Sequence, residues 1–273
     1  MASSVKPAPT LSPSGIGEHY DDFSWVYRLY WGEHIHHGLF RTGTEAAQPA
    51  QETMLRYCAG LVGIASGMNV VDVGCGYGGT ARFIAREYGC RVLGLTISQS
   101  QLNIANRMAQ SLHSPARVRF ELADAETYPF PAGEFDVVWN LESSEHFFDK
   151  AAYFRKVAAA LRRGGRLMLA AWSGSMESGL VCDIARVFLC PQLLTRDEYH
   201  DCIRQAGLRV LHSEEIGPQV ARTWELCARQ ARMAAPVVAA LPEKFRGFAQ
   251  GIALMQEGFR SGQLNYTIVM AEQ

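Results

Sequence analysis

The sequence predicts an α/β protein built on a doubly wound, mostly parallel sheet. Short apolar segments alternate with helix-compatible segments between residues 70 and 172, which is the pattern of strands joined by crossover helices. A glycine-rich loop follows the first of these strands directly, at Gly74-Cys75-Gly76-Tyr77-Gly78-Gly79. Ligands of such sheets bind at the carboxyl ends of the strands, so we expect the functional site at the edge where this loop lies.

The composition argues against nucleic acid and membranes as binding partners. The 273 residues are 48% hydrophobic and carry a formal net charge of −1, which gives no general attraction for nucleic acid or for an anionic membrane. No run of about 18 apolar residues predicts stable insertion into a membrane. Seven cysteines without C-x-x-C spacing are typical of reduced thiols rather than of disulfides or a zinc site. We expect a cytoplasmic protein, and the sequence leaves a homo-oligomer open.

The first 66 residues are expected to cover the sheet. Residues 1–15, rich in Ser, Pro and Ala without an apolar core, are interpreted as a disordered tail rather than a signal peptide. A helix with an aromatic face is predicted over 15–31 and a second one over 44–64. Between them lie His34, His36 and His37. Metal binding by these histidines is an alternative, but no carboxylate or cysteine stands at a familiar metal spacing. We therefore expect no metal, and we expect His36 to bind the carboxylate of a cofactor.

The remaining elements follow in order. Within a core expected over 67–173, strands are predicted over 70–73, 91–96, 118–122, 137–140 and 166–172, and helices over 81–88, 99–112 and 151–161. After residue 173, helices are predicted over 180–189, 196–206, 220–240 and 242–262, and strands over 208–213 and 264–270. This last part, 174–273, is expected to complete the core and to supply a helical lid, with Phe188, Trp224, Met233 and Met255 as walls of an apolar chamber.

The position of the acidic residue relative to the glycine loop distinguishes two classes of nucleotide-binding site. Glycines at 74, 76 and 79 satisfy the dinucleotide fingerprint G-x-G-x-x-G. A dinucleotide fold also needs a carboxylate about 20 residues further on for the ribose, and the strand 91–96 ends without one. Here an acid, Asp72, precedes the glycines instead. This pattern resembles the S-adenosylmethionine loop of class I methyltransferases and argues against a dehydrogenase.

The resemblance extends over about residues 16–270. The chain resembles gamma-tocopherol methyltransferase and its relatives within the class I methyltransferases. The matching segments are His19–Asp21, Trp31–Gly38, Val70–Gly79, Leu95–Ser98 with Gln101, Ala123–Ala125, Trp139–His146, Asp149–Lys150, Gly164–Arg166 and Met255–Gly262. Sterol C-methyltransferases and cyclopropane-fatty-acid synthases share the Thr-x-Ser-x-x-Gln stretch. The resemblance implies S-adenosyl-L-methionine as the cofactor and a Rossmann-like core with a helical cover and lid.

Physical chemistry assigns roles to the residues at the strand ends. Asp124 can accept from the adenine amino group while the Ala125 N–H reaches a ring nitrogen. Asp72 is expected to hold loop N–H groups or the cofactor's ammonium through charge-assisted bonds. The other expected cofactor contacts are Thr96, Ile97 and Gln101 at the ribose, the backbone of Gly74, Cys75 and Gly76 at the methionine, and Asn140 at the end of its strand.

Methyl transfer to a hydroxylated acceptor needs a base, because a neutral phenol is a poor nucleophile. His146 has a suitable pKa and Glu142 lies on the same turn, so both are catalytic candidates. A structural role remains open for each. The predicted function is methyl transfer to a hydrophobic small molecule, aromatic or prenylated, on C, O or N. The alternatives are a sterol- or fatty-acyl-type C-methyltransferase and a non-catalytic cofactor-binding subunit.

Overall fold

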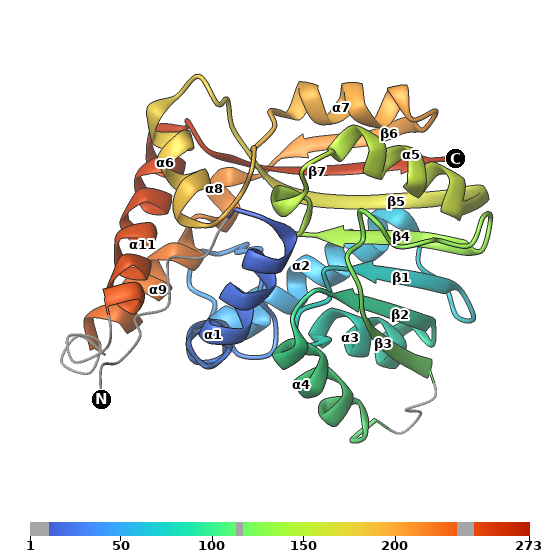
Figure 1. Ribbon diagram of the computed structural model, residues 1–273, viewed down its shortest axis with the longest axis horizontal. Helices are drawn as coiled ribbons and strands as arrows, with labels where there is room; N and C mark the ends of the chain where they lie inside the picture. Colours follow the sequence, from blue (N-terminus) through green and yellow to red (C-terminus); the bar gives the residue numbers. More distant parts are fainter. Residues whose placement is uncertain (1–10, 113–116, 234–242) are drawn as a thin grey trace.

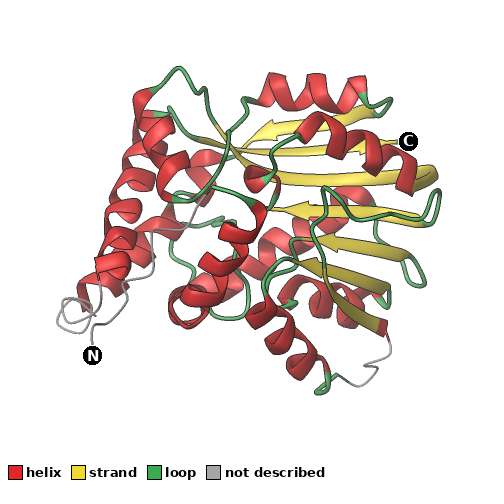
Figure 2. Cartoon of the chain, in the orientation of Figure 1, coloured by secondary structure: helices red, strands yellow, loops and turns green. Residues whose placement is uncertain are grey.

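The computed structural model describes residues 11–112, 117–233 and 243–273. Its centre is a seven-stranded sheet in the order β3-β2-β1-β4-β5-β7-β6 (Figures 1 and 2). The strands are β1 (Asn69–Val73), β2 (Arg91–Thr96), β3 (Val118–Leu122), β4 (Phe135–Leu141), β5 (Leu161–Ser173), β6 (Arg209–Glu215) and β7 (Asn265–Glu272). The first five run parallel, and β7 pairs antiparallel with both β5 and β6. The prediction of a mostly parallel, doubly wound sheet is confirmed.

Helices cover both faces of the sheet. They are α1 (Pro13–Trp31), α2 (Ala47–Val62), α3 (Gly79–Tyr88), α4 (Gln99–Ala109), α5 (Lys150–Ala160), α6 (Gly179–Val187), α7 (Arg196–Gln205), α8 (Gly217–Val220), α9 (Arg222–Met233) and α11 (Glu243–Ser261), with a 3₁₀ turn, η2 (Ser144–His146). Alternate strand residues pack on opposite sides. Val70 joins the cluster formed with α2, α3 and α4, and Val71 joins the cluster formed with α5 and α7.

Several element boundaries differ from the sequence prediction. The first helix begins at Pro13, inside the segment expected as a tail, because the Ser12 hydroxyl caps it by accepting from the Gly15 N–H at 3.1 Å. Strand β5 begins at Leu161 and passes through Gly164, whose φ of 73° gives a register shift. The helix expected over 220–240 begins as α9 at Arg222, after the separate short helix α8, and residues 234–240 lie outside the described part.

Helix α1 lies across the carboxyl ends of the parallel strands (Figure 1, dark blue). A Cβ added at Gly17 would lie 2.8 Å from the carbonyl oxygen of Ile97, so the helix backbone meets the β2–α4 loop directly. Asp21 accepts hydrogen bonds from the Ser98 hydroxyl and from the Ser100 N–H, which caps the N-terminus of α4. The N-terminal helix is therefore attached to the sheet by specific polar contacts.

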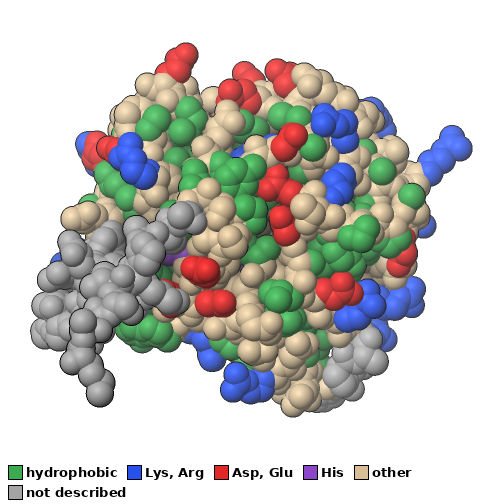
Figure 3. Space-filling view, viewed as in Figure 1, with side chains coloured by type: hydrophobic (Ala, Val, Ile, Leu, Met, Phe, Trp, Pro, Cys, Tyr) green, Lys and Arg blue, Asp and Glu red, His purple; other side chains and the backbone are tan. Residues whose placement is uncertain are grey.

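The C-terminal helices pack beside α1. Phe23, Tyr27 and Trp31 of α1 share a buried cluster with residues of α6, α9 and α11, including Trp224 and Met255. On the face that Figure 3 shows, acidic and basic side chains are interspersed. No helix of the described residues has the length and apolarity needed to span a membrane.

Candidate active site

A pocket lies where the parallel strands end, beneath α1; we call it the edge pocket. It encloses about 930 Å³, including open solvent at its mouth, within the size range of small-molecule sites. Twelve of the residues expected at the site line it: His36, Asp72, Gly74, Cys75, Gly76, Thr96, Ile97, Gln101, Asp124, Ala125, Glu142 and His146. Asn140 does not. Its amide donates to the Tyr153 hydroxyl at 2.9 Å and accepts from the Ser143 hydroxyl at 3.1 Å, so its expected cofactor contact is corrected to a structural one.

Two glycines of the loop have different roles, one in packing against a neighbouring residue and one in leaving space for a ligand. Gly74 has a φ of 72°, and a Cβ there would lie 2.3 Å from the Cβ of Ser143. Gly76 has a φ of 53°, and the nearest atom to an added Cβ is Cδ1 of Ile35 at 3.5 Å. Gly74 is therefore required by packing, whereas Gly76 faces the edge pocket and leaves room for a ligand.

Three buried polar atoms of residues that line the edge pocket have no protein partner among the described residues: Nδ1 of His34, Nε2 of His36 and Oδ2 of Asp72. Nδ1 of His36 donates to the carbonyl of His37 at 2.9 Å, and burial lowers the pKa of His36, so Nε2 carries a lone pair. Burial raises the pKa of Asp72 to about 7, against the opposing hydrogen bond from the Ala81 N–H. Two acceptors in one pocket, Oδ2 of Asp72 and Nε2 of His36, favour an ammonium partner over the carboxylate expected at His36.

The other end of the pocket is formed by the turns after β2 and β3. The Thr96 hydroxyl donates to Oε1 of Gln101 at 2.6 Å, which fixes the orientation of that side chain. Asp124 accepts from the Glu126 N–H at 2.9 Å through Oδ1. The backbone N–H of Ala123 donates to the carbonyl of Thr96 at 2.9 Å, which holds the two turns together.

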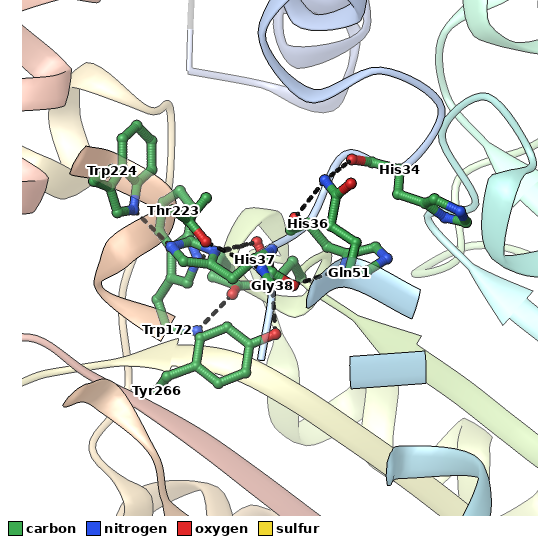
Figure 4. A network of polar contacts seen from close by, with 11 residues as sticks. His34, His36, His37, Gly38, Gln51, Trp172, Thr223, Trp224 and Tyr266 are labelled. Atoms are coloured by element: carbon green, nitrogen blue, oxygen red, sulfur yellow. Dashed lines mark hydrogen bonds and ion pairs between the residues drawn. The ribbon is translucent and has the colours of Figure 1, made fainter. Parts of the chain in front are cut away.

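Glu142 ends β4 with a φ of 52°, which is strained for a residue with a side chain. Its Oε1 accepts from the His37 N–H at 2.6 Å and from the Tyr266 hydroxyl at 2.8 Å. Its Oε2 accepts from Nδ1 of His37 at 2.9 Å and from the Trp172 indole at 3.3 Å (Figure 4). Burial raises the pKa of this carboxyl, but the interactions with His37 outweigh it, so the net shift is downward. Four donors leave little capacity for chemistry and favour the structural role.

The tautomer of His37 follows from Trp224. The Trp224 indole N–H lies 2.6 Å from Nε2 of His37 (Figure 4), and an indole can only donate. Nε2 must therefore hold a lone pair, and Nδ1 carries the proton that Glu142 accepts. The histidine segment is held further by Gln51, whose amide donates to the carbonyls of His34 and His36 at 2.7 and 3.1 Å. These contacts fix the ring of His37 and the backbone of the histidine segment.

His146 lies on η2 and bonds to α1. Its Nδ1 lies 3.2 Å from the carbonyl oxygen of Leu189, so Nδ1 donates and Nε2 accepts from the Tyr20 hydroxyl at 2.9 Å. Burial lowers the pKa of His146 to about 4, which keeps the ring neutral at physiological pH. The ring is thus a fixed, unprotonated base with its acceptor atom toward α1.

A second, smaller pocket adjoins the edge pocket; we call it the aromatic pocket. Its lining consists of Tyr20, Tyr27, Trp31, Ile35, His37, Glu142, Glu145, His146, Trp172, Phe188 and Trp224. Tyr20, Ile35, Glu142 and His146 line both pockets. The two spaces therefore meet at the Tyr20–His146 pair.

Two of the four expected wall residues line the aromatic pocket, Phe188 and Trp224. Met255 is buried in the core and lines neither pocket. Met233 is 68% exposed, because it ends α9 beyond the buried stripe that includes Trp224 and Cys227. That expectation is wrong.

Sequence reasoning missed several lining residues, above all Tyr20 and Trp172. Tyr20 belongs to the helix with an aromatic face that is predicted over 15–31. The available signal was its place beside His19 and Asp21 in the first segment of the family resemblance.

Comparisons with known proteins show which family the chain belongs to. The mycolic acid cyclopropane synthetase family matches residues 10–268. The chain is 28% identical over 284 residues to the chloroplastic tocopherol O-methyltransferase of Arabidopsis thaliana, covering 95% of this chain and 82% of the relative. It is 33% identical over 224 residues to the 27-O-demethylrifamycin SV methyltransferase of Amycolatopsis mediterranei, covering 80% and 82%.

Solved structures share the fold. The cyclopropane synthase MmaA2 from Mycobacterium tuberculosis has a TM-score of 0.86 at 20% identity, covering 98% of this chain and 100% of the other. The [4+2]-cyclase SpnF has a TM-score of 0.85 at 24% identity, covering 100% and 99%. The chain therefore belongs to the mycolic acid cyclopropane synthetase family, and it is a class I S-adenosyl-L-methionine-dependent methyltransferase related to the tocopherol methyltransferases.

Proposed function

We propose that the enzyme methylates a hydroxyl oxygen of a hydrophobic aromatic or prenylated molecule, with His146 as the base. The observation that carries this proposal is the Tyr20–His146 pair at the wall shared by the two pockets. The curated relatives include tocopherol O-methyltransferases and a methyltransferase of 27-O-demethylrifamycin SV, which supports oxygen as the methylated atom.

The edge pocket fits the cofactor. We assign its methionine ammonium to Oδ2 of Asp72 and Nε2 of His36, because these buried acceptors lack a protein donor among the described residues. The backbone of Gly74, Cys75 and Gly76 would lie along the methionine, since the loop leaves space there. When bound, S-adenosyl-L-methionine supplies an electrophilic methyl group on a sulfonium, and the sulfur that loses this methyl group leaves as a thioether.

The adenosine would occupy the opposite end of the pocket. Thr96, Ile97 and Gln101 are assigned to the ribose, because no carboxylate ends β2. Asp124 and Ala125 are assigned to the adenine: Oδ1 of Asp124 holds its own turn, and its second oxygen remains as an acceptor for the amino group.

The acceptor would lie in the aromatic pocket with its hydroxyl at the shared wall. The Tyr20 hydroxyl donates to His146 and keeps lone pairs on its oxygen, so it can pass the acceptor's proton to Nε2. The acceptor oxygen then forms its bond to the methyl group as the proton reaches His146, and charge is conserved. Leu189 stabilises the resulting imidazolium through its carbonyl.

The walls of the aromatic pocket favour this chemistry. Trp31, Trp172, Phe188 and Trp224 surround the polar groups, and such walls bind apolar rings while excluding water. A desolvated oxygen nucleophile attacks a sulfonium more readily than a hydrated one. Alignment of the two reacting atoms supplies most of the rate in such a displacement.

The test is to incubate the purified enzyme and methyl-labelled cofactor with extracts rich in hydrophobic phenols, and to identify labelled products by chromatography and mass spectrometry. The proposal predicts a labelled methyl ether. Label on a sterol or fatty-acyl carbon would support the alternative acceptor class. Cofactor binding without any labelled product would support a non-catalytic subunit.

A further inference from the structure

Glu145 lies between the catalytic candidates and has unused hydrogen-bonding capacity. It is 2% exposed and lines the aromatic pocket. Its Oε1 accepts from the backbone N–H of Trp172 at 2.7 Å. Its Oε2 has no partner among the residues that the structure describes. An unpartnered buried oxygen is costly unless a ligand completes it.

Nearby polar groups of the aromatic pocket are already engaged. The Tyr20 hydroxyl bonds to His146 and the Tyr27 hydroxyl to His19. The Trp172 indole donates to Glu142, and the Trp224 indole donates to His37. Unlike these groups, Oε2 of Glu145 has no protein partner among the described residues, so a ligand can still bind it.

The protonation state of Glu145 decides whether Oε2 is a hydrogen-bond donor or an acceptor. Burial and the neighbouring charge of Glu142 raise the pKa of Glu145 to about 8, against the opposing influence of Lys150. At neutral pH the carboxyl holds a proton. Because Oε1 accepts from Trp172, the proton belongs on Oε2, which becomes an O–H donor without a protein acceptor among the described residues. Lys150 fixes the turn by donating to the carbonyl of Phe147 at 2.7 Å.

We propose that Glu145 is a specificity-determining residue that donates a hydrogen bond to a second oxygen of the acceptor. The inference rests on the proposed function and deepens it. His146 would serve the oxygen that is methylated, and Glu145 would bind an oxygen elsewhere on the same ring system. The two residues are adjacent on η2 and line one small pocket whose other walls are mostly aromatic, so the preferred acceptor is a ring with two oxygen substituents.

The test compares ligands of matched shape by calorimetry in saturating S-adenosylhomocysteine. The probes are 2-naphthol and its 2,3-, 2,6- and 2,7-dihydroxy relatives. In the wild-type protein at least one diol should bind about tenfold more tightly than 2-naphthol, which corresponds to one net hydrogen bond. Equal affinities, or no binding of any probe, would overturn the proposal.

Two variants test whether Glu145 acts as a neutral hydrogen-bond donor or as a charged base. Glu145→Gln retains an oxygen for the Trp172 N–H and a donor in place of Oε2, so it should keep the preference for the diol. Glu145→Leu should abolish it. Preserved discrimination in Glu145→Leu would contradict the proposal, and so would its complete loss in Glu145→Gln. Glu134→Leu, at an exposed position, is the control for nonspecific effects.

Methyl transfer to the same probes is measured separately by mass spectrometry. A protein that methylates naphthols without preferring diols would retain the proposed function and lose this inference. A protein that discriminates between the probes without methylating them would retain the recognition site and lose the proposed function.

Discussion

Glu142 binds His37 through two hydrogen bonds, 2.6 Å from the backbone N–H and 2.9 Å from Nδ1. The pair joins the end of β4 to the histidine segment beneath the C-terminal helices. Tyr266 and Trp172 complete the coordination of the carboxylate. This arrangement assigns Glu142 to positioning, although it lines both pockets.

Glu142→Gln should therefore affect stability more than chemistry. The amide nitrogen would face donors, and each buried donor left without an acceptor costs about 1–3 kcal/mol. Urea denaturation measures the loss in free energy of unfolding, with exposed Glu134→Gln as the control. Unchanged stability combined with a large loss of turnover at full cofactor occupancy would instead show that Glu142 is catalytic.

We expect the wild-type protein to bind S-adenosylhomocysteine at micromolar concentration and not to bind NAD. Gly76→Val should abolish the binding of S-adenosylhomocysteine. A side chain at Gly76 would enter the edge pocket toward Ile35, and the φ of 53° disfavours a β-branched residue. Gly133→Val is the matched control, because Gly133 has a φ of 65° with no atom within 4 Å of an added Cβ. Equal calorimetric affinities for the two variants would remove Gly76 from the site, and NAD binding would contradict the cofactor assignment.

The affinity for S-adenosylhomocysteine should rise with pH through about 7, because the ammonium binds the ionised form of Asp72. Burial raises the pKa of this group from 3.8 to about 7. The unliganded protein shows the opposite trend: the stability contributed by protonated Asp72 is present below about pH 4 and is lost as pH rises through about 7. Titration calorimetry between pH 6 and 8 tests the binding. Asp72→Asn should bind weakly at every pH, and a flat wild-type profile would contradict the assignment.

Helix α1 should be protected from hydrogen exchange more strongly when cofactor is bound. Pro13, Ile16 and Tyr20 line the edge pocket, so the helix must move for a ligand to enter and leave. Asp21→Ala, which removes the contacts of α1 with Ser98 and Ser100, should accelerate exchange over 16–31 without cofactor. Helix α7, whose residues line neither pocket, is the internal control. Equal protection of α1 with and without cofactor would show that it is fixed scaffold.

The sequence predicted most of the elements because strand and helix periods and glycine turns are local properties. The edge pocket was also predictable, since parallel strands bring their carboxyl ends to one edge. Contacts between distant residues were not. Asn140 lies near the end of β4, in the expected place, but Tyr153 and Ser143 occupy its amide. Glu142 was ambiguous because its donors come from residues 37, 172 and 266.

The pairing of Tyr20 with His146 was equally invisible, because 126 residues separate them along the chain. No periodicity relates a tyrosine on the first helix to a turn after the fourth strand. The bulge in β5 shows a different limit: the sequence predicts this strand only over 166–172, yet it already begins at Leu161 and passes through Gly164.

The central claim is that His146 accepts the acceptor's proton, and the single-turnover rate of methyl transfer in His146→Gln tests it most directly. The measurement uses an acceptor identified from the labelled products, at saturating cofactor. Removing a positioned base should lower the rate by about 10²–10⁴-fold, while the affinity for S-adenosylhomocysteine stays within about twofold because the groups assigned to its ammonium, Asp72 and His36, are unchanged. A rate within about threefold of the wild type would contradict the account.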